Sequence, residues 1–182
     1  MKILGCFLIL LFVLIAIPAH ANDVALFGGV QHQGKLTLSS ATTSASTVTL
    51  NPKNFGVFGL RFSHGAIIGG EHTLAYAPNF IESQTKAFIY HSNLLLQVPT
   101  PKIKPYVTAG LGSVFTSGND IRDFGNKFAI NYGGGLKIFP AGPVGAQFDV
   151  RGYSIPDIKT QTLTVGQTLN IIEVSVGVAF SF

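Results

Sequence analysis

Charged side chains are scarce in this sequence. Asp, Glu, Lys and Arg make up 11% of its 182 residues, whereas an ordinary soluble domain contains roughly 25%. Much of the folded surface is therefore expected to face something other than water. The net positive charge is also small, because 12 Lys and Arg stand against 8 Asp and Glu. So small an excess, spread along the whole chain, does not predict a nucleic-acid-binding patch.

Cysteine is almost absent, and its one occurrence lies in a segment that we expect to be removed. Cys6 belongs to an apolar run over residues 3–17, which follows a lysine and leads into the sequence PAHA at residues 18–21. This pattern is typical of a signal peptide, and the run is short for a transmembrane helix. We therefore predict a signal peptide over 1–21 and a mature domain over 22–182, which has no disulfide or thiol chemistry.

Long apolar runs and helical periodicity are missing from the mature chain. No stretch of 18 apolar residues remains there, which argues against a helical membrane protein. The chain instead shows strand-like alternation, most clearly in its last ten residues, EVSVGVAFSF. Val or Phe occupies every second position from Val174 to Phe182, and the residues between them are small or polar. One face of this strand is therefore apolar.

Eight segments of this kind follow one another. They are Val24 to Gly34, Asn54 to Ser63, Ile67 to Ala77, Ala87 to Val98, Tyr106 to Phe115, Lys127 to Phe139, Val144 to Tyr153 and Leu169 to Phe182. Their connections alternate between long and short, as in small outer-membrane barrels with long external loops and short periplasmic turns. Strands of about ten residues, tilted near 40°, span the apolar band of about 25 Å. We predict an all-β fold, an eight-stranded antiparallel transmembrane β-barrel, whose last strand pairs with the first because lipid tolerates no open sheet edge.

The alternation also assigns charged side chains to the lumen. The inward set is Arg61, Lys137 and Arg151 with Glu71, Asp149 and Glu173. An eight-stranded barrel is only wide enough to be filled by its own side chains, so we expect these six to form a hydrogen-bonded ionic plug. Glu173 is the expected partner of Arg151 because their strands are neighbours. A conducting or gated narrow pore is the alternative.

Two segments resemble a known family. KPYVTAGLGSVF (Lys104 to Phe115) and NYGGGLKIFPAGPVGAQFDVRGYS (Asn131 to Ser154) are similar to the outer-membrane β-barrel domain of OmpA-like and small porin-like proteins. The resemblance implies a bacterial outer-membrane location, contact with outer-membrane lipid and lipopolysaccharide, and a monomer. The ending at Phe180 and Phe182 resembles the C-terminal signal that the outer-membrane assembly machinery recognises. No periplasmic domain follows, so the cell-wall tethering of full-length OmpA is not expected.

Enzymatic chemistry has one candidate, the sequence YHSN from Tyr90 to Asn93. Some eight-stranded barrels that resemble this one are lipid A deacylases, in which one residue separates the catalytic His and Ser. Here His91 and Ser92 are adjacent and point to opposite faces of a strand, which prevents the hydrogen bond that a serine nucleophile needs. We expect no enzyme, and a hydrogen-bonded lumen role for His91.

Metal and cofactor sites are not predicted. His32, His64, His72 and His91 are scattered without metal-ligand spacing. His72 is expected either to face lipid, neutral near the interface, or to be shifted inward by a bulge at Gly69 and Gly70. We predict that the segment Asn119 to Asp123 is a solvated loop; a site for a divalent cation or for lipopolysaccharide is the alternative. The most consistent function is a structural or surface-interaction barrel without cofactors. A narrow pore, a lipid A-modifying barrel and a soluble lipocalin-like carrier are the alternatives.

Overall fold

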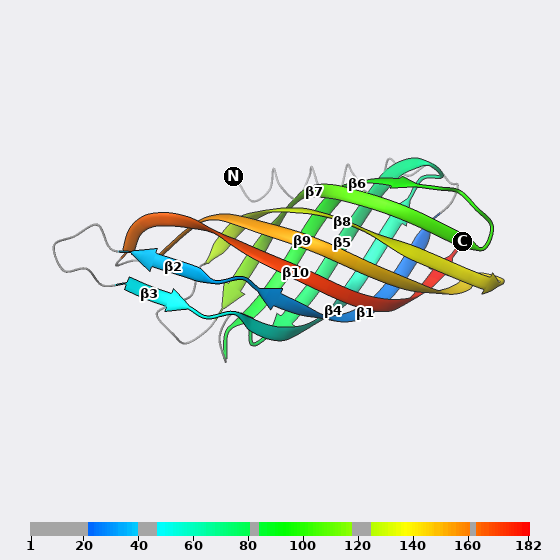
Figure 1. Cartoon of the computed structure of the whole chain (residues 1–182). Coiled ribbons are helices and arrows are strands. Elements are labelled where there is room, and N and C mark those ends of the chain that lie inside the picture. Colours follow the sequence, from blue (N-terminus) through cyan, green and yellow to red (C-terminus); the bar gives the residue numbers. More distant parts are fainter. Residues whose placement is uncertain (1–21, 40–46, 81–83, 118–124, 161–162) are drawn as a thin grey trace, which may run out of the picture.

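The structure, a computed structural model, describes residues 22–39, 47–80, 84–117, 125–160 and 163–182. All of the regular secondary structure in these ranges is β-strand (Figure 1). The strands are β1 (Asp23–Gln33), β2 (Leu36–Ser39), β3 (Thr47–Leu50), β4 (Lys53–His64), β5 (Ile68–Pro78), β6 (Lys86–Gln97), β7 (Ile103–Ser117), β8 (Asn126–Ala141), β9 (Val144–Thr160) and β10 (Leu163–Ser181). Within the described ranges, no helix is long and apolar enough to cross a membrane.

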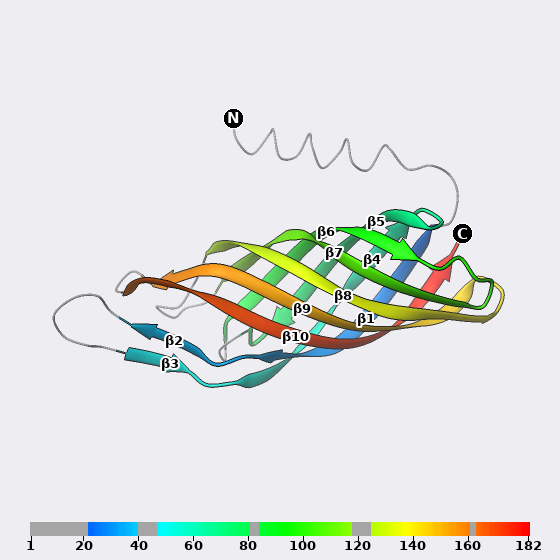
Figure 2. The ribbon, with the colours of Figure 1, turned by 45° about the horizontal axis from the view of Figure 1, so that its top comes forward.

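Eight of these strands form a closed antiparallel barrel in the order β1-β10-β9-β8-β7-β6-β5-β4, which confirms the predicted fold (Figures 1 and 2). Closure occurs between β1 and β10, in a register that runs from Asp23 with Ser181 to Gln33 with Ile171. The pairing continues to the last residue, because the amide of Phe182 donates to the carbonyl of Asn22 at 2.9 Å. The final strand therefore leaves no open edge for lipid to surround.

Two hairpins extend the sheet structure beyond the predicted strands. β2 pairs with β3 from Leu36 with Leu50 to Ser39 with Thr47, inside a segment that the sequence analysis treated as a long loop. β9 and β10 likewise continue past residues 154–168, which were also assigned to a loop. Thr and Val have high β-propensity, which favours local pairing of these segments in a hairpin. Figure 1 shows these hairpins projecting from the end of the barrel opposite the C-terminus.

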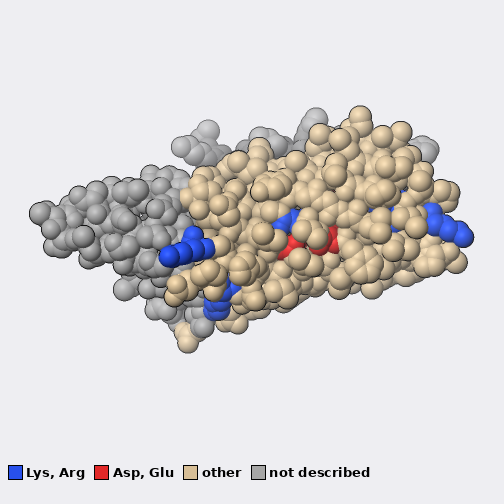
Figure 3. All heavy atoms as spheres, viewed as in Figure 1, with Lys and Arg blue, Asp and Glu red and all other residues tan. Residues whose placement is uncertain are grey.

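The barrel wall alternates as predicted between an apolar outside and a lumen-facing inside. On β10, Val174 and Val176 are each 55% exposed, whereas Glu173 and Ser175 between them are 0% and 2% exposed. The space-filling view shows that charged atoms are rare on the wall in front (Figure 3). Exposed apolar residues follow the same rule on every barrel strand: Leu26, Val30, Phe58, Leu60, Leu74, Phe88, Leu94, Val107, Leu111, Phe128, Tyr132, Phe148, Val150 and Val178.

Buried apolar and charged side chains are concentrated toward opposite ends of the lumen and meet in its middle. A cluster of buried apolar side chains extends from Phe27, which lies against Arg61, to Phe55, Ile155 and Leu169 toward the end opposite the chain termini. Phe80, from the β5–β6 connection, caps this cluster and packs edge-on against Phe55 with ring centroids 5.2 Å apart. Most of the charged side chains lie nearer the termini than Phe80, Ile155 and Leu169 do.

Candidate functional site in the barrel lumen

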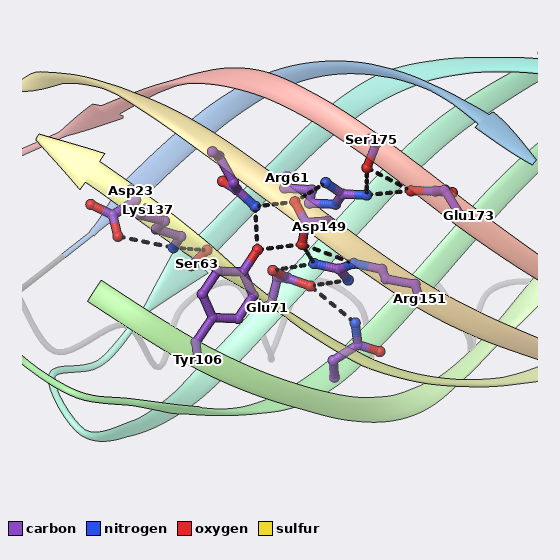
Figure 4. Close-up of polar contacts among 12 residues, drawn as sticks. Asp23, Arg61, Ser63, Glu71, Tyr106, Lys137, Asp149, Arg151, Glu173 and Ser175 are labelled. Atoms are coloured by element: carbon purple, nitrogen blue, oxygen red, sulfur yellow. Dashed lines mark hydrogen bonds and ion pairs between the residues drawn. The ribbon is translucent and has the colours of Figure 1, made fainter. Parts of the chain in front are cut away.

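Arg61 on β4 reaches across β1 to acids on β10 and β9 (Figure 4). One guanidinium nitrogen, Nη1, donates to Asp149 Oδ2 at 2.6 Å, and the other, Nη2, donates to Glu173 Oε1 at 2.6 Å. The guanidinium carbon lies 3.7 Å from the ring centroid of Phe27 on β1, a cation–π arrangement that supports the extended side chain. All three charged side chains are fully buried.

Arg151 on β9 bridges to the opposite wall of the barrel. Its Nη1 and Nη2 atoms donate to the two carboxylate oxygens of Glu71 on β5, at 2.5 and 3.0 Å. Strands β9 and β5 lie four places apart in the eight-stranded order, so this bidentate pair spans the lumen. Arg151 also donates to Asp149 Oδ1 at 2.8 Å, and Asp149 thereby joins the two arginines into one network.

Neutral donors complete the coordination of the acids. Asp149 accepts hydrogen bonds from the Tyr106 hydroxyl and from Gln147 Nε2, the latter at 2.9 Å. Glu173 accepts from the Tyr153 hydroxyl at 2.9 Å and from Gln31 Nε2 at 2.7 Å. The further donors are Ser175 to Glu173 and Asn93 to Glu71. These contacts matter because a buried carboxylate without hydrogen-bond donors is costly.

A second ion cluster lies nearer the termini. Lys137 Nζ donates to Asp23 Oδ2 at 3.0 Å and to Ser63 Oγ at 2.9 Å. Lys104 Nζ lies 3.7 Å from the other oxygen of Asp23 and is partly exposed. With these residues included, four basic side chains stand against four acidic ones in the lumen, so the interior is charge-balanced.

The structure brings together five of the six predicted lumen charges and places the sixth apart. Lys137 contacts Asp23 instead of joining the network of Arg61 and Arg151. The predicted pairing of Arg151 with Glu173 is wrong. These two residues are register partners on β9 and β10, but a long arginine side chain extends across the lumen. Arg151 therefore pairs with Glu71 on β5, and Glu173 pairs with Arg61 on β4.

Two lumen charges were missed by the sequence analysis. Asp23 and Lys104 have the inward parity of Ala25 and Tyr106 on their own strands, which are 2% and 4% exposed. The predicted strands began one residue after the start of β1 and three residues after the start of β7, and so left both charges outside the barrel. Continuing the alternation by one inward position at the start of each strand would have found them.

The histidine predictions have mixed outcomes. His91 is buried inside and Ser92 is exposed outside, in agreement with the opposite faces expected of adjacent residues. The expected hydrogen bond of His91 is wrong, because neither ring nitrogen has a partner among the described residues. Its ring packs against Tyr153 instead, with centroids 5.1 Å apart. His72 faces outward, and the pairing of β5 with both neighbours is uninterrupted at Gly70, so no bulge turns it inward.

Other predicted sites are placed as follows. The Asn119 to Asp123 segment lies outside the described residues, as does the predicted signal peptide over 1–21. Phe180 is 43% exposed and Phe182 is 71% exposed on the outer face, and their role in assembly stays a prediction. Within the described part of the chain, no group of three or more His, Cys, Asp or Glu side chains could hold a metal ion.

A closed antiparallel barrel with an apolar belt outside and buried ion pairs inside defines an integral membrane protein of the β-barrel class. The family comparison agrees. Residues 7–170 match the model of the outer membrane protein beta-barrel domain, and the chain belongs to this family. It is therefore a bacterial outer-membrane barrel, as the resemblance of its two segments implied.

Solved structures with the same fold are distant in sequence. Neisserial surface protein A (NspA) is 14% identical, with a TM-score of 0.59 over 87% of this chain and 97% of that one. The outer membrane protein OprG from Pseudomonas aeruginosa is 12% identical, with a TM-score of 0.54 over 88% of this chain and 96% of that one. No curated protein sequence matches the chain. At such identities the likeness concerns the fold alone.

Proposed function

We propose that this protein is a structural or surface-interaction barrel of the outer membrane whose lumen is closed to ions. The observation that carries the proposal is the bidentate contact of Arg151 with Glu71, because it joins opposite walls of the lumen. The apolar cluster under Phe80 adds a second obstruction between this contact and the external loops. An ion that crossed the barrel would have to displace both layers.

A non-enzymatic role is part of the proposal. The side chains of His91 and Ser92 lie on opposite sides of the barrel wall, so the imidazole has no route to the hydroxyl proton. The buried carboxylates are each engaged by an arginine or lysine. This arrangement supports a lumen that maintains the fold and leaves interaction to the surface.

The proposed partners follow from the surface at each end. Lys35 and Lys86 are exposed at the end of the barrel remote from the termini. We propose that they bind the phosphates of lipopolysaccharide in the outer leaflet. Phe180 and Phe182 are assigned to recognition by the assembly machinery, after export directed by residues 1–21. The barrel is proposed to act as a monomer.

Liposome swelling and lipid A analysis together test this function. Proteoliposomes that contain the folded barrel should swell in sugar or amino-acid solutions no faster than empty liposomes. Lipid A from cells that overproduce the barrel should have the same mass spectrum as lipid A from cells that lack it. Rapid swelling would establish the narrow pore instead, and a new lipid A species would establish the barrel enzyme.

A further inference from the structure

Two hydrogen-bonded polar pairs lie on the outer face of the barrel, at the end remote from the termini. His32 on β1 and Asn54 on β4 are register partners, and His32 Nδ1 lies 2.7 Å from Asn54 Oδ1. The Ser154 hydroxyl on β9 donates to Asn170 Oδ1 on β10 at 2.6 Å. The amide of Gly34, which follows β1, donates to the carbonyl of Asn170 at 2.9 Å and so places the second pair beside the first. These four side chains form an outer polar patch across four neighbouring strands, about 14 Å wide at roughly 4.8 Å between strands.

The outer polar patch lies at the edge of the apolar belt. Val30 and Ile172 are the next outward residues after His32 and Asn170 toward the middle of the wall, and they are 52% and 56% exposed. On β9, Val150 has the same outward parity as Ser154 and is 58% exposed. The change from apolar to polar side chains therefore marks the level at which the hydrocarbon ends and the lipid headgroups begin.

The composition of this boundary differs between the two sides of the barrel. On β5, β6 and β7 it consists of aromatic rings, because Tyr76, Phe88 and Phe115 occupy neighbouring register positions near the remote ends of their strands. Aromatic residues at the membrane interface are usual in β-barrels. On β4, β1, β10 and β9 the outward residues of the patch carry amide, imidazole and hydroxyl groups instead. That side of the wall therefore presents hydrogen-bonding groups to the headgroups.

The patch offers both donors and acceptors but carries no carboxylate, lysine or arginine. Asn54 Oδ1 is paired with His32, and Asn170 Oδ1 accepts from Ser154, so the side-chain NH2 groups of both asparagines are available to a ligand. The Ser154 oxygen keeps lone pairs that accept. Sugar hydroxyl and amide groups donate and accept in the same way, whereas a phosphate pairs best with arginine or lysine. The chemistry of the patch therefore matches a sugar.

We propose that the outer polar patch binds the glucosamine backbone of lipid A, the lipid part of lipopolysaccharide. The inference rests on the proposed contact with lipopolysaccharide and adds the sugar to the phosphates. Lipid A is amphipathic in the same order as this wall, because its sugars face Asn54 and Asn170 when its acyl chains lie against Val30 and Ile172. The patch holds the glycolipid on one side of the barrel, along β9, β10, β1 and β4.

Nuclear magnetic resonance of the folded wild-type barrel in phosphatidylcholine bicelles tests the proposal with two probes. One probe is lipid A from which the phosphates have been removed, and the other is phosphatidylethanolamine with acyl chains of similar length. The side-chain amide signals of Asn54 and Asn170 should shift with dephosphorylated lipid A and stay in place with phosphatidylethanolamine. The amide signal of Asn93, which is buried in the lumen, should not shift with either probe. Equal shifts with both probes, or no shift with lipid A, overturn the proposal.

Variants separate the sugar contact from the phosphate contact when lipid A binding is measured by native mass spectrometry. Asn54→Leu and Asn170→Leu should each weaken binding of phosphorylated and dephosphorylated lipid A about 2- to 10-fold, as expected for the loss of one neutral hydrogen bond. Ser92→Leu, on the outer face of β6, should leave both unchanged, and Lys86→Ala should weaken binding of the phosphorylated form alone. Heat-modifiable migration establishes that every variant is folded.

The outcomes distinguish this proposal from the proposed phosphate contact. If Lys86→Ala has no effect while the two asparagine variants keep theirs, the phosphate contact fails and the sugar contact stands. If the asparagine variants bind dephosphorylated lipid A as tightly as the wild type does, or if Ser92→Leu weakens binding as much as they do, the outer polar patch is not a sugar site.

Discussion

Replacing Arg151 with alanine should destabilise the barrel strongly. The substitution removes four hydrogen bonds, two to Glu71 and two to Asp149. Asp149 keeps Arg61, Tyr106 and Gln147, but Glu71 is left fully buried with Asn93 as its one remaining side-chain donor among the described residues. Removing one partner of a buried pair typically costs about 3–5 kcal/mol, so the free energy of unfolding should fall by about that amount.

Urea unfolding of the barrel in lipid vesicles measures this change through the shift from the compact to the slow-migrating band on unheated gels. The Arg151→Ala midpoint should move to markedly lower urea at an unchanged slope. The matched rescue is Arg151→Met with Glu71→Leu, which removes both charges of the pair and should restore most of the loss. Arg151→Met with Glu173→Leu should not, because Glu173 is the partner of Arg61. An unchanged Arg151→Ala midpoint, or rescue by the Glu173 variant alone, would refute the assigned pairing.

Three further predictions concern the wall, the C-terminus and the enzyme alternative. Val176→Arg should destabilise the folded barrel in vesicles by about 2–4 kcal/mol, because the arginine would face lipid near the midplane. Val176→Leu is the neutral control, and equal folding yields for the two variants would contradict the outward orientation of residue 176. Deletion of Phe182 should reduce the amount of assembled barrel in cells, measured by surface labelling, and normal levels would argue against its role as an assembly signal. His91→Ala and Ser92→Ala should leave host lipid A unchanged by mass spectrometry, and an activity that either variant abolishes would restore the enzyme.

The sequence was sufficient for the barrel because lipid imposes a simple rule on it. Side chains alternate between an apolar exterior and a polar lumen, so parity alone assigned Val176 outward and Glu173 inward, as the structure has them. The same rule did not apply beyond the membrane. β2 and β3 form a separate two-stranded sheet, and the Ser- and Thr-rich sequence that contains them was indistinguishable from a polar loop.

The pairing of the lumen charges was beyond the reach of the sequence. Parity states which residues face inward but gives no information about how far a side chain reaches. Arg151 and Glu173 are register neighbours, yet Arg151 contacts Glu71 on the far wall. Such contacts depend on the barrel diameter and on which neighbours fill the space between, for example Phe27 beneath Arg61. The ring contact between His64 and His72 on the outer face likewise depends on the hairpin register and on the space left by Gly70.

Single-channel recording of the purified barrel in a planar bilayer tests most directly whether the lumen is closed. Wild-type protein at high salt should give a flat baseline without conductance steps, since Arg151 and Glu71 join opposite walls. Arg151→Ala, inserted at the same protein density, should give discrete openings. Stable steps from the wild type, with the same conductance in Arg151→Ala, would contradict the account and identify the barrel as a narrow pore.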